Sequence, residues 1–595
     1  MKPNNLLVKF LIWRIKHIPN KNFMLILSGI IGIFSGLAAV SLKTSVHYIQ
    51  GFLTSGFDVK YANYLYIGYP LVGILLSLFI ARYFFGERLG HGITNILYSI
   101  SKRSSIIRRT KIYSRMITSA LTVGLGGSVG LEAPIVVTGS AIGSNMGSLM
   151  HLNYKRRTLL IGCGAAGAIS AIFNSPIAGV IFSIEIILAD VIIAAFIPLL
   201  IASVSGALVS LLLLGDNVMF YFKLTDTLKA SDIPFYILLG ILCGLGSVYF
   251  TRVTYVIEGW VNKIRHSVLK AVVGGIALGL IVFIFPPIYG EGYNTIKTLL
   301  AGNDSVILNS SPFFDHIDNT LFLIVFMIGV ALVKPMASAL TVGAGGSGGL
   351  FAPSLFLGGM AGYLYAKITN LVIGENLIST SNFTLVGMCG LMSGVLHAPL
   401  TAIFLIAEIT SGYTLFVPLM LVSAIAYSTS SYFENYSVYT KRLIEKGDLI
   451  PHDKDRQVLS LIHLSKLIEK DLLKIHPDAT LGDLVDLVRI SKRNIFPVVD
   501  EEEKLMGIVT LDDIRELMFD EESRKNIYVK SLMHSPPESV SSYENMLSVM
   551  GKFEKTGAWN LPVIDDEKYT GFVSKSRIFN AYRKKLINQH REYVS

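Results

Sequence analysis

One acidic side chain lies in an apolar, glycine-rich stretch. There it could carry a proton or compete with an anion for a binding site. Glu132 belongs to the segment SALTVGLGGSVGLEAP (Ser119–Pro134) and is the only Asp or Glu between residues 89 and 184. The closing proline and the apolar residues after it predict the start of a helix. A helix that starts inside an apolar protein directs its free N–H groups and the positive end of its dipole inward, which favours an anion.

This carboxylate has two interpretations. Placing a charge in an apolar segment costs about 2.5–3.5 kcal/mol on insertion scales, and such residues are usually functional. An ionised Glu132 could occupy the anion site and vacate it when protonated, and would then act as a gate and a proton carrier. The alternative is a structural acid that caps the helix.

The same segment occurs twice, which indicates how the chain positions it. Ser338–Pro353 reads SALTVGAGGSGGLFAP, with thirteen of sixteen positions identical at an offset of 219, and Phe351 replaces the glutamate. A second pair, FNSPIAGVIFSIEI (Phe173–Ile186) and LHAPLTAIFLIAEI (Leu396–Ile409), recurs at an offset of 223. We therefore predict a duplicated half of roughly 200 residues, with two helix starts that face a common point.

The second repeat carries an acid in each copy. Glu185 and Glu408 follow matched prolines, Pro176 and Pro399. Because both copies keep the acid while a transport pathway needs only one, we expect these two side chains to stabilise short helices or loops rather than bind ions.

The composition is that of a polytopic membrane protein. Hydrophobic residues make up 52% and charged residues 16%, and the mean hydropathy is +0.55. A soluble chain would carry about a quarter charged residues. The net charge of +10 fits basic cytoplasmic loops better than nucleic-acid binding. The three cysteines all lie in apolar segments and predict neither disulfides nor a zinc site.

Charge distribution gives the expected topology and domains. Basic residues precede the first apolar span (Phe23 to about Tyr48), and residues 101–115 hold six Lys or Arg and no acid, so we expect the N-terminus and this loop in the cytoplasm. Some later apolar segments are long enough to span a bilayer, such as Val191–Leu214 and Phe235–Ile257, whereas others are interrupted by Gly or Pro and too short. Residues 1–446 contain 17 of the 42 acids. We predict a membrane domain over 1–446 (halves 20–215 and 235–445), a linker over 447–466, a cytoplasmic domain over 467–585 and a tail over 586–595.

These motifs resemble the CLC family of chloride channels and chloride/proton exchangers. GLEAP (Gly130–Pro134), GLFAP (Gly349–Pro353), GHGIT (Gly90–Thr94) and YSVYTKRL (Tyr436–Leu443) are similar to its signature segments and occur in the family's order. The resemblance implies an all-α membrane domain of inverted repeats with broken helices, a homodimer, and one anion pathway per subunit. It implies Glu132 as gate and proton acceptor, and these chloride-binding residues: Gly130, Leu131, Leu350, Phe351, Tyr439 and His91.

Two positions depart from the family pattern. His91 replaces a serine at the inner gate, and its imidazole could donate to an anion or equally contact a neighbouring loop. Ile186 stands where exchangers that have an inner proton glutamate carry it, and an aliphatic side chain cannot relay a proton. Both chloride/proton exchange and a chloride channel without coupling remain open, and we take exchange as the first hypothesis.

The C-terminal part is a second duplication. FPVVDEEEKLMGIVTLDDI (Phe496–Ile514) matches LPVIDDEKYTGFVSKSRI (Leu561–Ile578), each predicting a strand, an acidic turn, a second strand and a helix. This resembles a tandem pair of CBS domains (467–520 and 529–585), an α+β unit. The resemblance implies that Thr510 and Asp513 could bind the ribose of an adenine nucleotide. An ordinary helix N-cap, in a purely structural pair, is the alternative.

Rival functions from other classes make different demands on the sequence. A CBS-regulated magnesium pathway would need pore acids or carbonyl clusters, and a membrane-anchored nucleotide sensor would not need a duplicated, broken-helix half. We find no nucleophile–base pair, metal cluster or phosphate-binding loop, and so expect neither an enzyme nor a required cofactor. We predict an integral protein of a prokaryotic plasma membrane, with chloride, protons, lipid and a second copy of the chain as partners.

Overall fold

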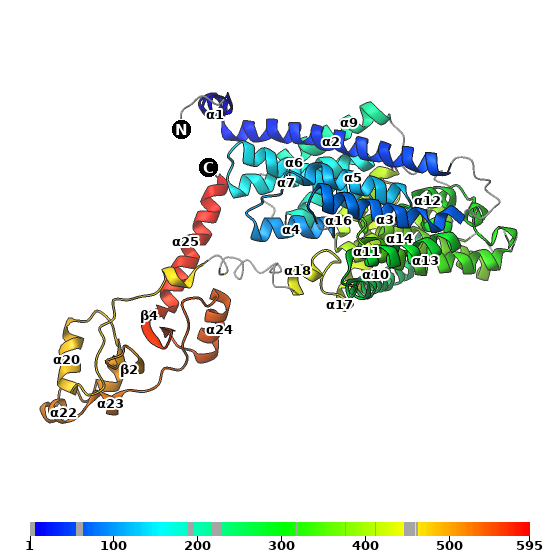
Figure 1. Cartoon of the computed structure of the whole chain (residues 1–595). Coiled ribbons are helices and arrows are strands. Elements are labelled where there is room, and N and C mark those ends of the chain that lie inside the picture. The colour runs from blue at the N-terminus through cyan, green and yellow to red at the C-terminus, as the bar shows by residue number, and fades with distance from the viewer. Residues whose placement is uncertain are drawn as a thin grey trace. The chain divides into compact units, whose positions relative to one another are not determined.

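The computed structural model describes residues 6–594 except 55–63, 88, 189–194, 216–228, 317–318, 375–376, 411, 446–458 and 460–461. The chain divides into two compact units, Met1–Leu449 and Ile450–Ser595. The first unit is helical, and the second combines helices with two small antiparallel sheets (Figure 1). The predicted fold class is therefore confirmed. Most of the segment expected to be a linker, 447–466, lies outside the described residues.

The first half of the membrane unit contains helices of very unequal length. After α1 (Leu6–His17), the 35-residue α2 (Asn20–Thr54) covers the first predicted span. The short α8 continues as a π-helical turn, η3 (Ser183–Ile187). The other elements are η1 (Tyr64–Ile67), α3 (Tyr69–Phe79), η2 (Ile80–Phe84), α4 (Gly92–Lys102), α5 (Lys111–Gly124), α6 (Glu132–Leu149), α7 (Tyr154–Phe173), α8 (Pro176–Phe182) and α9 (Phe196–Leu214).

The second half repeats this series. Its helices are α10 (Ile233–Asn262), α11 (Ser267–Ile284), α12 (Tyr293–Leu300), α13 (Thr320–Gly343), α14 (Phe351–Ile373), α15 (Thr380–Leu396), α16 (Pro399–Ile409), α17 (Phe416–Phe433) and α18 (Lys441–Glu445). The same pairs of helices pack in both halves: α6 on α7 as α14 on α15, and α2 on α9 as α10 on α17. The sequence repeat is thus a structural repeat.

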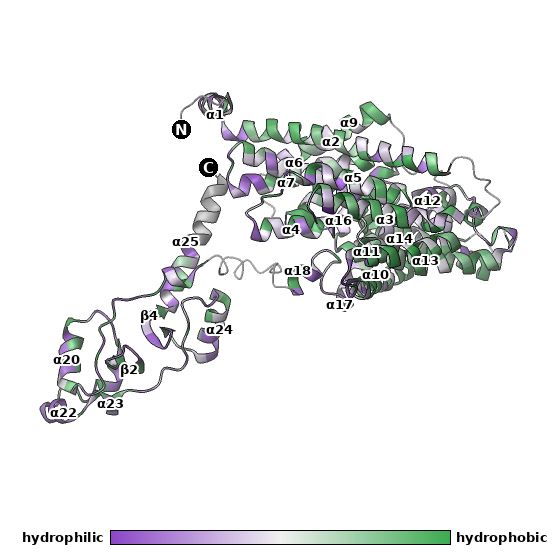
Figure 2. Cartoon of the chain, viewed as in Figure 1, coloured by the Kyte–Doolittle hydropathy of each residue, from purple (hydrophilic) through white to green (hydrophobic). Residues whose placement is uncertain are grey.

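Apolar side chains cover much of the membrane unit. Among the described residues, eight helices are long and apolar enough to cross a membrane. Hydrophobic residues dominate these helices, whereas the C-terminal unit contains more hydrophilic residues (Figure 2). Others, such as the seven-residue α8 and the eleven-residue α16, are shorter than the roughly 20 residues that a bilayer requires. The chain therefore builds its membrane unit from complete and partial spans.

Matched glycines set the closest helix contacts in each half. A Cβ atom on Gly139 of α6 would overlap the carbonyl of Gly164 of α7, and the reverse also holds. Gly358 of α14 and Gly387 of α15 form the equivalent reciprocal contact. At both places the backbones touch where any side chain would force the helices apart.

Crossed hydrogen bonds join the two halves through the matched acids. The carboxylate of Glu408 accepts from the N–H groups of Ile177 (3.0 Å) and Ala178 (2.8 Å) at the start of α8. Reciprocally, Glu185 accepts from the N–H groups of Leu400 (3.2 Å) and Thr401 (2.8 Å) at the start of α16. Each acid thus caps a short helix of the opposite half, and the structural role expected for Glu185 and Glu408 is confirmed.

The C-terminal unit contains two similar hairpins. Strands β1 (Ile495–Val499) and β2 (Leu505–Thr510) pair antiparallel, as do β3 (Asn560–Asp565) and β4 (Lys568–Ser574). One further residue pairs in parallel with the first strand of each hairpin: Ile475 with Val498 of β1, and Val540 with Val563 of β3. The helices of this unit are α20 (Leu481–Ile490), α21 (Leu511–Ile514), α22 (Glu521–Asn526), α23 (Val529–Leu532), α24 (Met546–Thr556) and α25 (Lys575–Val594). The strand–turn–strand–helix order predicted for both copies is present.

Candidate functional site

The two glycine-rich segments meet inside the membrane unit. Gly130 and Gly349 form a reciprocal pair of backbone hydrogen bonds, each N–H donating to the other's carbonyl at 2.9 Å. Two further hydrogen bonds join the segments symmetrically. The N–H of Ser128 donates to Thr341 Oγ1 (3.2 Å), and that of Ser347 donates to Thr122 Oγ1 (3.0 Å). The pairing brings together the residues that immediately precede α6 and α14.

Both helices begin directly at this junction. Helix α6 starts at Glu132 and α14 at Phe351, and neither Leu131 nor Leu350 offers a side-chain cap to the first turn. The N–H groups of a first helical turn lack intrahelical partners and carry partial positive charge. Two sets of such donors therefore start next to one another in the buried interior. The predicted positions Gly130, Leu131, Leu350 and Phe351 all lie at this junction.

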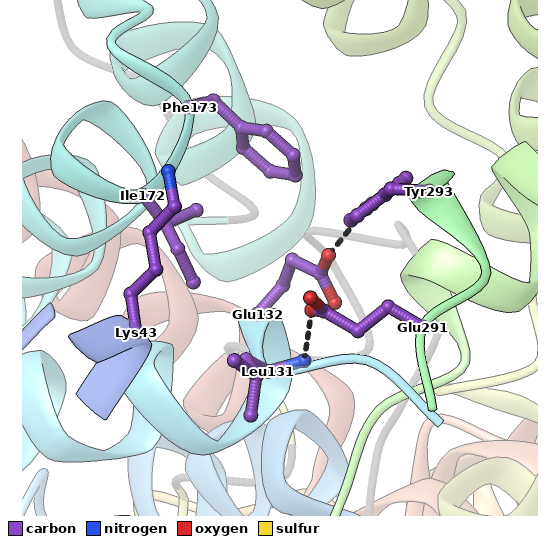
Figure 3. Close-up of a pocket in the computed structure, with 7 residues that line it drawn as sticks. All are labelled: Lys43, Leu131, Glu132, Ile172, Phe173, Glu291 and Tyr293. Carbon is purple, nitrogen blue, oxygen red and sulfur yellow. Dashed lines mark hydrogen bonds between the residues drawn. The ribbon is translucent and has the colours of Figure 1, made fainter. Parts of the chain in front are cut away.

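Glu132 is buried at the junction and is held through one oxygen. Its side chain is 1% exposed, and Oε1 accepts a hydrogen bond from the hydroxyl of Tyr293 at 2.6 Å (Figure 3). Oε2 has no hydrogen-bond partner among the described residues. This oxygen lies against Gly130, where a Cβ atom would overlap it. Glycine at 130 is therefore required for the carboxylate to fold back onto the junction.

A pocket extends from Glu132 past a second carboxylate. The N–H of Leu131 donates to Glu291 Oε1 at 3.2 Å, so Glu291 lies at the start of α6 beside Glu132. Figure 3 shows both carboxylates in the same pocket, with the side chain of Tyr293 above Glu132. The lining residues come from four parts of the membrane unit: Lys43, Leu131, Glu132, Ile172, Phe173, Glu291 and Tyr293.

The loop that carries Glu291 is fixed by a buried lysine. Lys334 of α13 is fully buried, and its Nζ donates to the carbonyls of Ile288 (3.3 Å), Gly290 (3.2 Å) and Glu291 (3.5 Å). Its ammonium group also lies 4.8 Å from the ring centroid of Phe356. The charge of Lys334 is thus placed close to the pocket while its donors hold the backbone there.

Helix α4 links the positions of Tyr439 and His91, because His91 directly precedes this helix and the first turn of the helix contacts Tyr439. The hydroxyl of Thr94, in the first turn of α4, donates to the carbonyl of Tyr439 at 2.9 Å. The hydroxyl of Tyr439 is buried and has no hydrogen-bond partner among the described residues. The start of α4 packs on α6, because a Cβ atom on Gly92 would touch Val137 and Ala133. Tyr439 therefore carries an unused donor in the interior of the unit.

His91 contacts a neighbouring element. Its Nε2 lies 2.9 Å from Glu258 Oε2 of α10, and the same carboxylate pairs with Arg442. Of the two alternatives for this side chain, contact with an adjacent segment is the one that the structure contains. A chloride-binding role for His91 stays a prediction.

The expected nucleotide residues form a helix cap. The hydroxyl and the N–H of Thr510 both donate to Asp513 Oδ2 at 2.7 Å, and His534 Nε2 lies 3.2 Å from the same oxygen. In the second copy, Ser574 donates to Glu469 Oε1 at 2.6 Å, and Glu469 pairs with Arg493 at 2.5 Å. The geometry at Thr510 and Asp513 is that of the N-cap alternative, and nucleotide binding stays a prediction.

Sequence reasoning missed three residues of the pocket. Glu291, Tyr293 and Lys334 come from the second half of the membrane unit, whereas Glu132 stands out in the sequence as the only acid between residues 89 and 184. The signal was present, because Lys334 is a single charge within the apolar span Thr320–Gly343 and Glu291 stands between two glycines. Which acid lies beside Glu132 could not be deduced, since it depends on the packing of the two halves.

Comparisons with known proteins agree with this architecture. The family model described as voltage-gated chloride channel matches residues 72–431, and the CBS domain model matches residues 464–520 and 529–584. Chloride channel protein CLC-f of Arabidopsis thaliana is 27% identical over 552 residues, which cover 83% of this chain and 69% of the relative. The voltage-gated ClC-type chloride channel ClcB of Escherichia coli is 27% identical over 327 residues, 55% of this chain and 74% of the relative.

Solved structures share the fold. A crystal structure of a eukaryotic CLC transporter has a TM-score of 0.60 at 20% identity and covers 93% of this chain and 97% of its own. A slow cyanobacterial Cl⁻/H⁺ antiporter gives the same TM-score and identity over 71% of this chain and 97% of its own. At this level of identity the likeness concerns the fold.

Proposed function

The chain belongs to the voltage-gated chloride channel (CLC) family and carries two CBS domains, and on that premise we propose that it exchanges chloride for protons across a membrane, with Glu132 as the gate. The family membership makes it a chloride-transport protein. The observation that carries the finer proposal is the Gly130–Gly349 pairing, which starts two helices next to a buried glutamate. This family, rather than a magnesium pathway, is the one that the membrane unit matches.

The gate follows from the chemistry of the junction. An ionised Glu132 is stabilised by the amides and helix dipoles that an anion would use, so carboxylate and chloride compete for one place. The carboxylate lies against Gly130 at the start of the two helices, which supports this proposal. Protonation removes its charge and weakens those interactions, so the side chain can leave and chloride can enter. Oε2, which has no partner among the described residues, is the oxygen available to a proton.

The deeper part of the chloride pathway is assigned to the amides of α14 and to Tyr439. Leu350 and Phe351 supply N–H groups at the start of α14, and the buried Tyr439 hydroxyl supplies an O–H donor. A chloride ion between them would accept from both kinds of donor, and the low-dielectric surroundings would strengthen these hydrogen bonds. The two groups come from different parts of the second half.

The proton-coupled hypothesis is tested by measuring both ions together. Purified protein in liposomes should drive protons uphill when a chloride gradient is imposed. Glu132→Ala should retain chloride flux and lose proton movement, because alanine cannot carry a proton. Unchanged chloride flux and coupling in Glu132→Gln would remove the gate assignment.

A chloride channel without proton coupling is the second candidate, and Ile186 favours it. Its partly buried aliphatic side chain stands where a second proton-carrying acid would be expected. In this case wild-type liposomes would show chloride flux with no proton movement. Proton movement in liposomes of the unmodified protein therefore distinguishes the channel from the exchanger.

Regulation through the CBS domains is a further part of the proposal. Thr510 and Asp513 currently satisfy one another, and a ribose hydroxyl could replace that internal hydrogen bond. Isothermal titration of the full chain with ATP and AMP should show binding that Asp513→Ala removes. Absence of heat with every adenine nucleotide would leave the pair with its structural role alone.

Orientation and assembly are proposed from charge and surface. Six basic residues in 101–115 support a cytoplasmic position for that loop, and with it for the N-terminus and the CBS domains. Large apolar side chains exposed on α9 and α17, including Leu212, Val417 and Met420, face lipid or a second copy in a homodimer. The three native cysteines are buried, so single introduced cysteines can report both sidedness and cross-linking between copies.

A further inference from the structure

Glu291 is a second carboxylate in the pocket of Glu132, and the transport scheme above does not use it. Its Oε1 accepts from the N–H of Leu131, the residue that precedes the first turn of α6 (Figure 3). Leu131 is one of the positions assigned to chloride binding. In the structure a side-chain carboxylate therefore holds a donor that an anion would need.

The local sequence presents Glu291 in a fixed way. Gly290 (φ 62°) and Gly292 (φ 88°) both adopt the left-handed region, which bends the backbone on each side of Glu291. A Cβ atom on Gly292 would press against the ring of Phe356. Together with the three carbonyls held by Lys334, this fixes the backbone from which the carboxylate reaches Leu131.

Exposure along the pocket places Glu291 between Glu132 and the surface. Lys43 is exposed, Glu291 is partly buried, and Glu132 is 1% exposed. All three line the same pocket. Glu291 is thus intermediate in exposure between a surface residue and the buried Glu132 of the same pocket.

We propose that Glu291 is an outer gating carboxylate, which holds the Leu131 N–H in the closed state and yields it to an anion only when it moves away or takes up a proton. The inference rests on the proposed role of Glu132 and adds a second gate in series with it. A carboxylate is suited to this because, like chloride, it is an anion that accepts from backbone N–H groups, and it can be neutralised by one proton.

The charged groups around Glu291 define how its gate responds to pH. They are Glu132 from α6, Lys43 from α2 and Lys334 from α13, and the hydroxyl of Tyr293 from α12 also faces the pocket. Two carboxylates that share a pocket disfavour each other's ionised form and titrate as a pair. For this reason the contribution of Glu291 is best measured after Glu132 has been removed.

The test compares chloride flux from liposomes between about pH 5 and pH 8 in the Glu132→Ala background. Glu132→Ala alone should still lose flux as pH rises, by about tenfold or more, because one hydrogen bond to a charged group contributes at least about 1.5 kcal/mol. Adding Glu291→Gln should make the flux nearly independent of pH. The control variant adds Asp304→Asn instead. Asp304 is a carboxylate that pairs with Lys367 away from the pocket, so its removal should leave the pH dependence of flux in Glu132→Ala unchanged.

Two results would overturn the proposal: a flat pH profile for Glu132→Ala alone, or an unchanged slope after Glu291→Gln. Should Glu291→Gln fail to fold, Glu291→Asp keeps the charge but shortens the reach to Leu131, and it should weaken the dependence on pH. Chloride titration calorimetry at pH 7.5 gives a readout without transport, and Glu291→Gln should bind chloride about tenfold more tightly than its parent. Failure of the Glu132 gate is recognised separately, by intact proton coupling in Glu132→Ala.

Discussion

At the scale of single residues, the gate is defined by what holds Glu132. One oxygen receives the hydroxyl of Tyr293, and the other has no partner among the described residues. The donor from Tyr293 stabilises the carboxylate in its buried position, because a buried polar group without a hydrogen bond costs free energy. The single acid in the glycine-rich segment was identifiable from sequence. Its donor was not, since Tyr293 follows a glycine turn 161 residues further along the chain.

Tyr293→Phe should loosen the closed gate. The substitution keeps the ring and removes the hydroxyl that donates to Glu132 Oε1, a hydrogen bond that contributes about 1.5–3 kcal/mol when the acceptor is charged. Chloride flux at neutral pH should rise several-fold. Tyr289→Phe removes a hydroxyl that donates instead to the carbonyl of Gly124 and serves as the matched control. Equal flux in wild type and Tyr293→Phe would show that this hydrogen bond does not restrain the gate.

At the scale of elements, contacts at the ends of helices position the residues of the site and join the two halves. Helices α6 and α14 start at the paired glycines, and α8 and α16 are capped by the acid of the opposite half. The sequence predicted the helix starts from proline and the structural role of Glu185 and Glu408 from their repetition. The crossing of the caps could not be predicted, because a repeat reports that two segments are alike and not which one each contacts.

Removing a crossed cap should lower stability and leave selectivity intact. Glu408→Ala leaves two N–H groups at the start of α8 without their acceptor, and loss of a cap costs about 0.5–2 kcal/mol. Thermal unfolding in detergent should shift down by a few degrees, with Glu408→Gln in between. A change in the chloride-to-proton ratio would mean instead that Glu408 takes part in transport.

The matched glycine contacts make an equally specific prediction. Gly358→Ala places a methyl group on the carbonyl of Gly387, and overpacking of this kind costs about 1–3 kcal/mol. We expect a lower yield of folded protein and a lower unfolding temperature. Gly259→Ala, in helix α10 with no heavy atom near the new methyl group, should be neutral or slightly stabilising. An unfolding temperature of Gly358→Ala that is not lower than that of Gly259→Ala would contradict this prediction.

The cap at Thr510 should make the first CBS domain sensitive to acid. Burial opposes the ionisation of Asp513, but donation from Thr510 and the nearby His534 outweigh it and hold the pKa of Asp513 below its usual range. Because the folded pKa is depressed, the stabilisation is present above the ordinary pKa of an aspartate, about 4, and is lost as pH falls through the folded value. Hydrogen exchange of residues 510–514 in the full chain should be faster in Asp513→Asn than in wild type at pH 7. The difference should persist down to about pH 4 and should narrow only as pH falls further, through the folded pKa of Asp513.

At the scale of the whole molecule, duplication explains both units. Each half of the membrane unit contributes one glycine-rich helix start, and the site exists only where the two halves meet. The C-terminal unit likewise pairs two similar hairpins. Repeats, composition and the change in acid content were enough to predict this organisation. The asymmetry that makes a transport site, with Glu132 in one copy, Phe351 in the other and Glu291 beside them, depends on contacts that no single repeat encodes.

The central claim, that an anion binds where the two glycine-rich helix starts meet, is tested most directly by anomalous diffraction from crystals grown in bromide. The account predicts a bromide peak within hydrogen-bond distance of the N–H groups of Leu350 or Phe351 and of the Tyr439 hydroxyl. In Glu132→Ala crystals it predicts a further peak at the place of the missing carboxylate. Bromide found only elsewhere, with none at the Gly130–Gly349 junction in either crystal, would contradict it.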